Sequence, residues 1–338
     1  MLDTGSSGST PDPARAIQSG MADVSVNTLL VAIVAIALGF AVTIAASRWA
    51  VSDAAALASG TRIPPFIIGI TLLAIGTDLP EIANSIAASI SGHGDINVGD
   101  SVGSAVTQAT LVVGLLPIVG GAFIAGRRRV ARIGGATVGA LLLGALLMSD
   151  GYLSRGDAIL LIGSWLAGSA LVWRDLPPEA QPSMQVEVRG KLRKAFTVLV
   201  ALGVVAVGAT VVVWGLATLA EALSVSEYLV AFVLASLGTS LPELVVNLTA
   251  IRQGQRDLAV GGALGASFVD STLSIAAGPL IAPVAVTASL VVRGSIAAAV
   301  TIGLVVVLLS MRRRHDRVSG FILVAMYFVF YAVVITVL

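Results

Sequence analysis

Two short stretches place a carboxylate and neighbouring hydroxyl or carboxyl groups in the middle of long apolar segments. Residues 76–81 read Gly-Thr-Asp-Leu-Pro-Glu, and residues 238–243 read Gly-Thr-Ser-Leu-Pro-Glu. A charged side chain at bilayer depth is costly, so it is rarely there without a function. The proline before each glutamate lacks an N–H and loosens the helix. Membrane transporters hold cations where loosened helices bring carbonyl and side-chain oxygens together near the midplane.

Oxygen-bearing side chains share helical faces around both glutamates. Thr77 and Glu81 are four residues apart and Asp78 and Glu81 are three apart, so one helical face can present all three. Asp100 lies near the outer, N-terminal end of the next apolar segment. It could equally stabilise the start of that helix or contact an ion. The candidate ligands from both copies are Thr77, Asp78, Glu81, Ser104, Gln108, Thr239, Ser240, Glu243 and Asp270.

Four of these candidates are carboxylates that would approach one centre if the two copies fold together: Asp78, Glu81, Glu243 and Asp270. Ionised carboxylates at that centre would repel one another strongly in a low dielectric. Either cations neutralise them or some of them bind protons. Oxygen ligands without histidine or cysteine favour Na⁺, Ca²⁺ or Mg²⁺ over zinc or copper. We therefore expect a cation site and no cofactor.

The composition excludes an ordinary soluble domain. Of the 338 residues, 57% are hydrophobic and only 12% are charged, which is typical of a polytopic membrane protein. The chain has no cysteine, so it has no disulfide and no thiolate metal site. The formal net charge of +1 does not by itself indicate a partner.

Hydropathy predicts an all-α membrane protein, because crossing a bilayer takes about 20 apolar residues. Ten transmembrane helices are expected at 27–49, 64–90, 98–124, 133–149, 157–173, 195–218, 226–252, 258–280, 292–311 and 319–338. The expected divisions are a disordered N-terminal tail at 1–26, a first membrane region at 27–173, a cytoplasmic linker at 174–194 and a second membrane region at 195–338.

The basic residues predict the orientation of the chain in the cell membrane. Seventeen of the 20 lysines and arginines fall in alternate loops on one side, which the positive-inside rule makes cytoplasmic. Both termini would then lie outside. The arginine clusters at 127–129 and 312–314 are expected to anchor this topology and not to bind nucleic acid.

An internal repeat relates the two halves of the chain. A constant offset of 162 residues pairs Glu81 with Glu243 and aligns residues 76–111 with the second half without a gap. Because each half has five spans, the loop at 91–97 would face outside and its partner at 253–257 would face the cytoplasm. This predicts two inverted five-helix repeats with a site at their interface.

These residues resemble the two signatures of the cation/calcium exchanger superfamily, especially its prokaryotic sodium/calcium exchangers. Residues 238–243 match the first signature, Gly-Thr-Ser-Leu-Pro-Glu, and residues 76–81 match it at all positions except Asp78. Residues 99–108 and 261–270 resemble the second, Gly-Asn-x-x-Gly-Ser-Asn-x-x-Asn/Asp. The resemblance implies alternating access in which a Na⁺ gradient drives Ca²⁺ the other way. It implies that Glu81 and Glu243 are shared by both ions, that Thr77 and Thr239 lend oxygens, and that Na⁺ sites include Ser104, Ser240 and Asp270.

Five positions depart from the family pattern. Asp78 stands in place of serine, Gln108 in place of asparagine and Ala266 in place of serine, while Asp100 and Gly262 replace asparagine. The centre therefore gains a carboxylate and loses a hydroxyl. An exchanger for Mg²⁺, or one coupled to H⁺, is an alternative. The Gly-Asn-x-x-Glu signature of the proton-coupled branch is missing, which keeps Na⁺ the favoured driving ion.

Two other classes of function are weaker interpretations. Residues 92–95 read Gly-His-Gly-Asp, like intramembrane aspartyl proteases, but such an enzyme needs two facing aspartates and Asp95 falls in a predicted loop. A passive channel would dissipate a Ca²⁺ gradient without a counter-ion. We therefore predict a transporter and no enzyme, with cations and the lipid bilayer as partners and no obligate protein partner.

Overall fold

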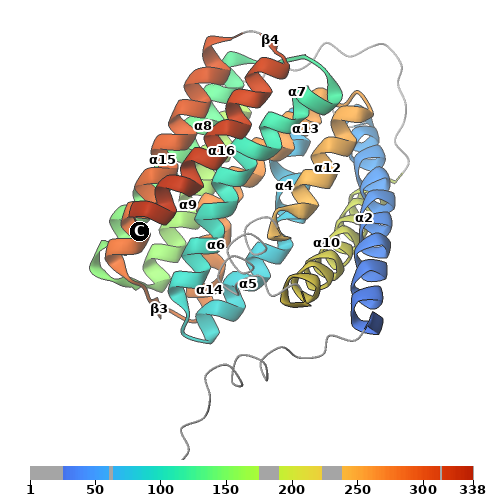
Figure 1. Ribbon diagram of the computed structural model, residues 1–338. Coiled ribbons are helices and arrows are strands. Elements are labelled where there is room, and N and C mark those ends of the chain that lie inside the picture. Colours follow the sequence, from blue (N-terminus) through green and yellow to red (C-terminus); the bar gives the residue numbers. More distant parts are fainter. Residues whose placement is uncertain (1–25, 61–63, 175–189, 223–237, 313, 338) are drawn as a thin grey trace, which may run out of the picture.

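The computed structural model describes residues 26–60, 64–174, 190–222, 238–312 and 314–337. Apart from two short antiparallel ladders, the regular structure of this part is helical (Figure 1). The expected tail at 1–26 lies outside the described residues except for Val26, and the expected linker at 174–194 lies outside them at 175–189. Residues 226–237 of the expected span at 226–252 also lie outside them.

The first half of the chain forms a long helix, two interrupted helices and two straight ones. Their elements are α2 (Val26–Gly60), α3 (Pro65–Ile68), η1 (Gly69–Leu73), α4 (Ala74–Thr77), α5 (Leu79–Ile90), α6 (Gly94–Thr107), η2 (Gln108–Val112), α7 (Val113–Gly120), β1 (Phe123–Ile124), α8 (Arg127–Leu147), η3 (Met148–Asp150), β2 (Tyr152–Leu153) and α9 (Arg155–Arg174).

The described part of the second half repeats this order of elements. Its elements are α10 (Lys191–Ala222), α12 (Leu241–Arg252), α13 (Arg256–Val269), η4 (Asp270–Ser274), α14 (Ile275–Ile281), β3 (Val284–Ala285), α15 (Ala288–Met311), β4 (Arg314–His315) and α16 (Arg317–Val337).

Seven described helices are long and apolar enough to cross a bilayer. The pair Pro65–Thr77 and Leu79–Ile90, bent by 45°, would make an eighth. The protein is thus a helical membrane protein, while the expected total of ten spans stays a prediction. The largest difference from an expected boundary is that α2 extends to Gly60 instead of ending near residue 49. The hydroxyl of Thr197 donates to Asp53 at 2.6 Å, so packing against α10 supports the polar end of the helix.

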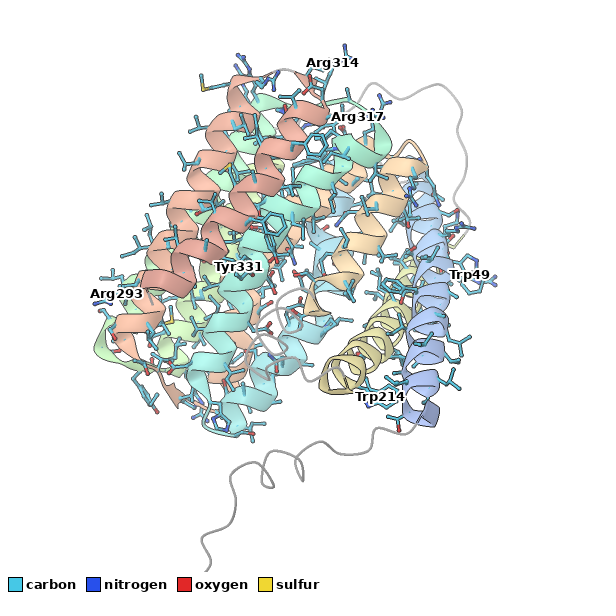
Figure 2. The ribbon with its side chains drawn as sticks, in the orientation of Figure 1. Trp49, Trp214, Arg293, Arg314, Arg317 and Tyr331 are labelled. Atoms are coloured by element: carbon cyan, nitrogen blue, oxygen red, sulfur yellow. The ribbon has the colours of Figure 1, made fainter. Side chains whose placement is uncertain are left out.

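The helices α2 and α10 pack closely along each other at one side of the molecule (Figure 1). Small residues make this possible, because a Cβ added at Gly215 of α10 would lie 2.9 Å from the carbonyl oxygen of Ala32. Trp49 and Trp214 lie on the outer surface of the pair (Figure 2), with 72% and 52% of their surfaces exposed. In a membrane this apolar surface faces lipid.

Helix α13 lies at the centre, and its residues from Leu258 to Val269 are all buried. It crosses the segment formed by α3 and η1 at backbone distance. A Cβ added at Gly69 would lie 2.7 Å from the amide nitrogen of Gly262 and 2.7 Å from the carbonyl oxygen of Leu258. Glycine is therefore required at position 69 for the two inner helices to cross this closely.

Three inner helices contain a turn of π-helix, namely η1, η2 and η4. A π turn locally disrupts the regular α-helical hydrogen bonds and often marks a functional site. Two of these turns begin at candidate ligands, η2 at Gln108 and η4 at Asp270. These two residues are separated by the same 162 positions as Glu81 and Glu243.

The two ladders connect helical hairpins at opposite ends of the molecule (Figure 1). In one, Phe123 of β1 pairs with His315 of β4. In the other, Tyr152 of β2 pairs with Ala285 of β3. Each ladder pairs a loop of the first half with a loop of the second, so backbone hydrogen bonds link the two halves at both ends of the molecule.

Candidate cation site

Each repeat breaks its helix one residue after the threonine of the signature. Asp78 separates α4 from α5, and Ser240 precedes α12. Their backbones are nearly identical, with φ −79° and ψ 8° at Asp78 and φ −81° and ψ 5° at Ser240. A proline two residues later cannot donate an N–H to continue the helix across the break. The break brings Glu81 and Glu243 into the first turns of new helices.

Three carboxylates converge at these helix starts. Asp78, Glu81 and Glu243 each have a carboxylate oxygen within 4.8 Å of such an oxygen on the other two. None of the three side chains is exposed. Asp270, at the start of η4, is equally buried, and η4 packs against α5, the helix that carries Glu81. Three of the four carboxylates expected to approach one centre therefore meet there, and Asp270 lies on an element that packs against it.

Most oxygens of these carboxylates lack a hydrogen-bond donor. Among the described residues, no partner is found for either oxygen of Glu81, Glu243 and Asp270, or for Oδ2 of Asp78. Buried polar atoms in proteins are normally hydrogen-bonded, and a buried charge is normally paired. A cluster of acceptors that lacks donors can be satisfied by cations or by protons.

The neutral candidates have different hydrogen-bond partners. Gln108 reaches the cluster, because its Nε2 lies 3.5 Å from Oδ1 of Asp78. Ser104 and Thr239 lie together, with their hydroxyl oxygens 3.2 Å apart. Thr77 donates its hydroxyl proton back into its own helix, to the carbonyl oxygen of Leu73 at 3.0 Å, as threonines often do.

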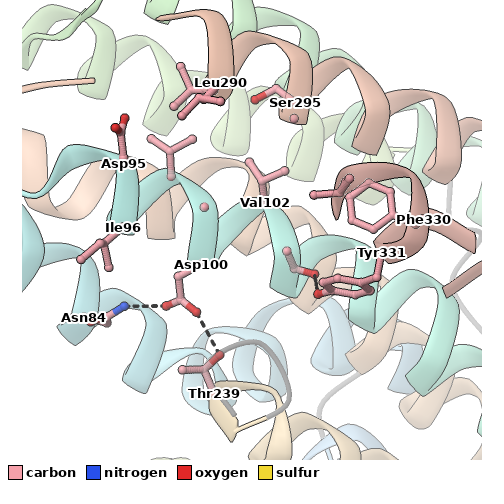
Figure 3. Close-up of a pocket in the computed structure, with 16 residues that line it drawn as sticks. Asn84, Asp95, Ile96, Asp100, Val102, Thr239, Leu290, Ser295, Phe330 and Tyr331 are labelled. Atoms are coloured by element: carbon pink, nitrogen blue, oxygen red, sulfur yellow. Dashed lines mark hydrogen bonds between the residues drawn. The ribbon is translucent and has the colours of Figure 1, made fainter. Parts of the chain in front are cut away.

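Two residues outside the candidate set belong to the site. Asn84 Nδ2 donates to Asp100 Oδ2 at 2.7 Å, and the hydroxyl of Thr239 donates to Asp100 Oδ1 at 3.2 Å (Figure 3). Asp100 therefore contacts a candidate ligand. Asn84 follows Glu81 by three residues, so the helical spacing used for the other candidates could have identified it.

Comparison with known families decides what kind of membrane protein this is. The family model described as sodium/calcium exchanger protein matches residues 31–174 and 194–336, which is most of the chain. The chain belongs to the sodium/calcium exchanger family. The two matched segments correspond to the two halves that the internal offset relates.

Relatives of this exchanger chain align over most of its length. The protein CaxA of Alkalimonas amylolytica is 29% identical over 307 residues, which cover 87% of this chain and 96% of CaxA. The sodium/calcium exchanger MaX1 of Methanosarcina acetivorans is 24% identical over 296 residues, covering 74% and 83% of the two chains.

A solved structure of the sodium-calcium exchanger NCX_Mj, soaked with 10 mM Na⁺ and zero Ca²⁺, has the same fold. It aligns with a TM-score of 0.74 at 24% identity, covering 90% of this chain and 99% of that one. The chain thus shares its fold with that exchanger over most of its length.

Proposed function

We propose that this protein is a secondary active antiporter that exchanges Na⁺ for Ca²⁺ across the cell membrane by alternating access. The observation that carries the proposal is the buried cluster of Asp78, Glu81, Glu243 and Asp270, whose oxygens largely lack donors. Ca²⁺ takes six to eight oxygen ligands, and carboxylates flanked by hydroxyl and amide oxygens suit it. Membership of the exchanger family makes cation antiport the expected class of transport.

The proposed ligand roles are those that the resemblance to the exchanger signatures implies. Glu81 and Glu243 stand at equivalent places in the two repeats and would be shared by Ca²⁺ and Na⁺. Oxygens of Thr77 and Thr239 would complete the shared site. The Na⁺ sites would use Ser104, Ser240 and Asp270, while Asp78 and Gln108 remain candidate ligands without an assigned ion.

Two inverted five-helix repeats would supply the two access states. The paired ladders at opposite ends and the π turns at Gln108 and Asp270 support this arrangement, because both features recur at or near the offset of 162 residues. Exchange of roles between such repeats opens a central site first to one side and then to the other. By the positive-inside rule, the loop charges would place both termini outside.

A second candidate is an antiporter that moves H⁺ in place of some Na⁺, or Mg²⁺ in place of Ca²⁺. The specific observation behind it is Asp78, which adds a buried carboxylate to the cluster and has the amide of Gln108 as its contact. A carboxylate without enough cations around it binds a proton.

The test is ⁴⁵Ca²⁺ uptake into proteoliposomes under an outward gradient of Na⁺, of H⁺ or of neither, with Mg²⁺ as competitor. We expect uptake with Na⁺ inside and none without a counter-ion. Glu81→Gln and Glu243→Gln should abolish it, because each removes a shared charge from the cluster. Uptake that needs no counter-ion would indicate a channel, and uptake driven by H⁺ alone would favour the second candidate.

A further inference from the structure

Asp100 lies in the wall of a cavity and contacts Thr239, one of the candidate ligands. The cavity has a volume of about 630 Å³ and lies between α6, α15 and α16 (Figure 3). Its wall is mostly apolar, with Leu290, Phe330 and Tyr331 on the side of α15 and α16. Asp100 and Thr239 lie together at the opposite wall, where the cavity meets the site.

The contacts of Asp100 fix the direction of a chain of hydrogen bonds. Both of its oxygens accept, Oδ2 from the amide of Asn84 and Oδ1 from the hydroxyl of Thr239. A hydroxyl has one proton, so Thr239 cannot also donate to Ser104. The hydroxyl of Ser104, 3.2 Å from that of Thr239, must then be the donor between them.

This direction determines what the two hydroxyls offer to a cation. A hydroxyl that binds Na⁺ must present a lone pair and keep its proton turned away from the ion. Donation from Ser104 to Thr239, and from Thr239 to Asp100, turns both protons toward the carboxylate. We propose that Asp100 is a positioning residue for Na⁺ binding, which acts by orienting the hydroxyls of Thr239 and Ser104. The inference rests on the proposed exchange function.

The position equivalent to Asp100 in the other repeat has no carboxylate to accept such a hydrogen bond. The offset of 162 residues relates Asp100 to Gly262, which has no side chain to accept a hydrogen bond. Asp100 also lies in the second turn of α6, after Asp95, whose carboxylate instead accepts from the backbone and hydroxyl of Thr287. Asp95 therefore lies in the first turn of α6, where a carboxylate stabilises a helix start, and Asp100 does not have that role.

The test compares Na⁺-driven ⁴⁵Ca²⁺ uptake in proteoliposomes for the wild type, Asp100→Ala and Asp100→Asn. In Asp100→Ala the half-saturating Na⁺ concentration should rise by about tenfold, the scale of one charge-assisted hydrogen bond, with a smaller change in maximum rate. Asp100→Asn should recover most of this loss, because its amide oxygen can accept from Thr239 while Asn84 rotates. Asp95→Asn, in the same cavity wall, is the control and should match the wild type.

A double-mutant cycle separates positioning from a general structural role. In a Thr239→Val background, Asp100→Ala should have no further effect on half-saturation, because the hydroxyl through which it acts is gone. Equal effects in both backgrounds would overturn the inference. If Asp100→Ala does not fold, Asn84→Ala removes the second donor to the same carboxylate and should raise half-saturation severalfold; an unchanged value would also overturn it.

Uptake by wild-type vesicles shows whether a failed test contradicts the proposed function or only the role of Asp100. Wild-type vesicles without Na⁺-dependent uptake would overturn both. Active wild-type vesicles together with an Asp100→Ala variant of unchanged half-saturation would overturn only the role of Asp100.

Discussion

At the scale of single residues, the important atoms are carboxylate oxygens buried without donors. Leaving a buried polar group unsatisfied costs about 1–3 kcal/mol, and more for a charged group. Glu81, Glu243 and Asp270 each have two such oxygens among the described residues. A cation that binds between them offsets this cost, so the affinity of the site and the stability of the protein are coupled.

Replacing Asp78 should change the ion preference or pH dependence of transport more than it changes the stability of the fold. Asp78→Ser restores the serine of the family signature and removes one of four neighbouring negative charges, so repulsion within the cluster decreases. We expect the dependence of ⁴⁵Ca²⁺ uptake on pH to become flatter, or the preference for Ca²⁺ over Mg²⁺ to change severalfold. The unfolding temperature in detergent should stay near that of the wild type. Identical pH and ion profiles would argue that the extra carboxylate has no role in transport.

At the scale of elements, the site depends on inner helices that are broken and that cross at backbone distance. The breaks at Asp78 and Ser240 turn helix starts toward the cluster, and the π turns begin at Gln108 and Asp270. These features hold only while α13 stays against η1. The glycines at that crossing are therefore structural requirements of the cation site.

Gly69→Ala should destabilise the protein by about 1–3 kcal/mol, the usual cost of overpacking a core. The added Cβ would lie 2.7 Å from backbone atoms of Gly262 and Leu258, and backbone cannot move aside as a side chain can. Thermal unfolding in detergent measures the effect. Gly163→Ala in α9 is the matched control, since a Cβ there meets nothing within 4 Å. Equal unfolding temperatures for the two variants would contradict the close crossing.

The ladder of β1 and β4 should make stability depend on pH. His315 is fully buried beside Phe123, with ring centroids 5.3 Å apart. Burial lowers the pKa of His315 from its ordinary 6.5, and the nearby charge of Arg312 also lowers it, although Asp316 opposes this effect. The unfolded chain then binds the proton more readily than the folded one, so this contribution to stability is present above pH 6.5 and is lost as the pH falls below it.

Replacing His315 by phenylalanine should reduce this acid sensitivity. Unfolding temperatures measured in detergent on both sides of pH 6.5 should fall less on acidification in the variant than in the wild type. His93, the other histidine, is exposed, and His93→Asn is the control that should behave like the wild type. Parallel pH profiles for wild type and His315→Phe would show that this histidine is not the titrating group.

At the scale of the whole molecule, the sequence predicted the family and the helical membrane class, and both are confirmed. It also predicted that Asp78, Glu81 and Glu243 converge, because an inverted repeat with acidic residues at equivalent places brings its two copies together. The π turns, the extension of α2 and the bond from Thr239 to Asp100 were not predicted. They depend on how segments distant in the chain cross, and hydropathy and local spacing contain no information about those crossings.

The most direct test of the account is equilibrium binding of ⁴⁵Ca²⁺ to the purified protein in detergent, with Na⁺ as competitor. One buried cluster that serves both ions predicts saturable Ca²⁺ binding, displacement by Na⁺, and loss of binding by at least about tenfold in Glu81→Gln and in Glu243→Gln. Wild-type affinity in either variant, or Ca²⁺ that Na⁺ does not displace, would contradict a single shared site.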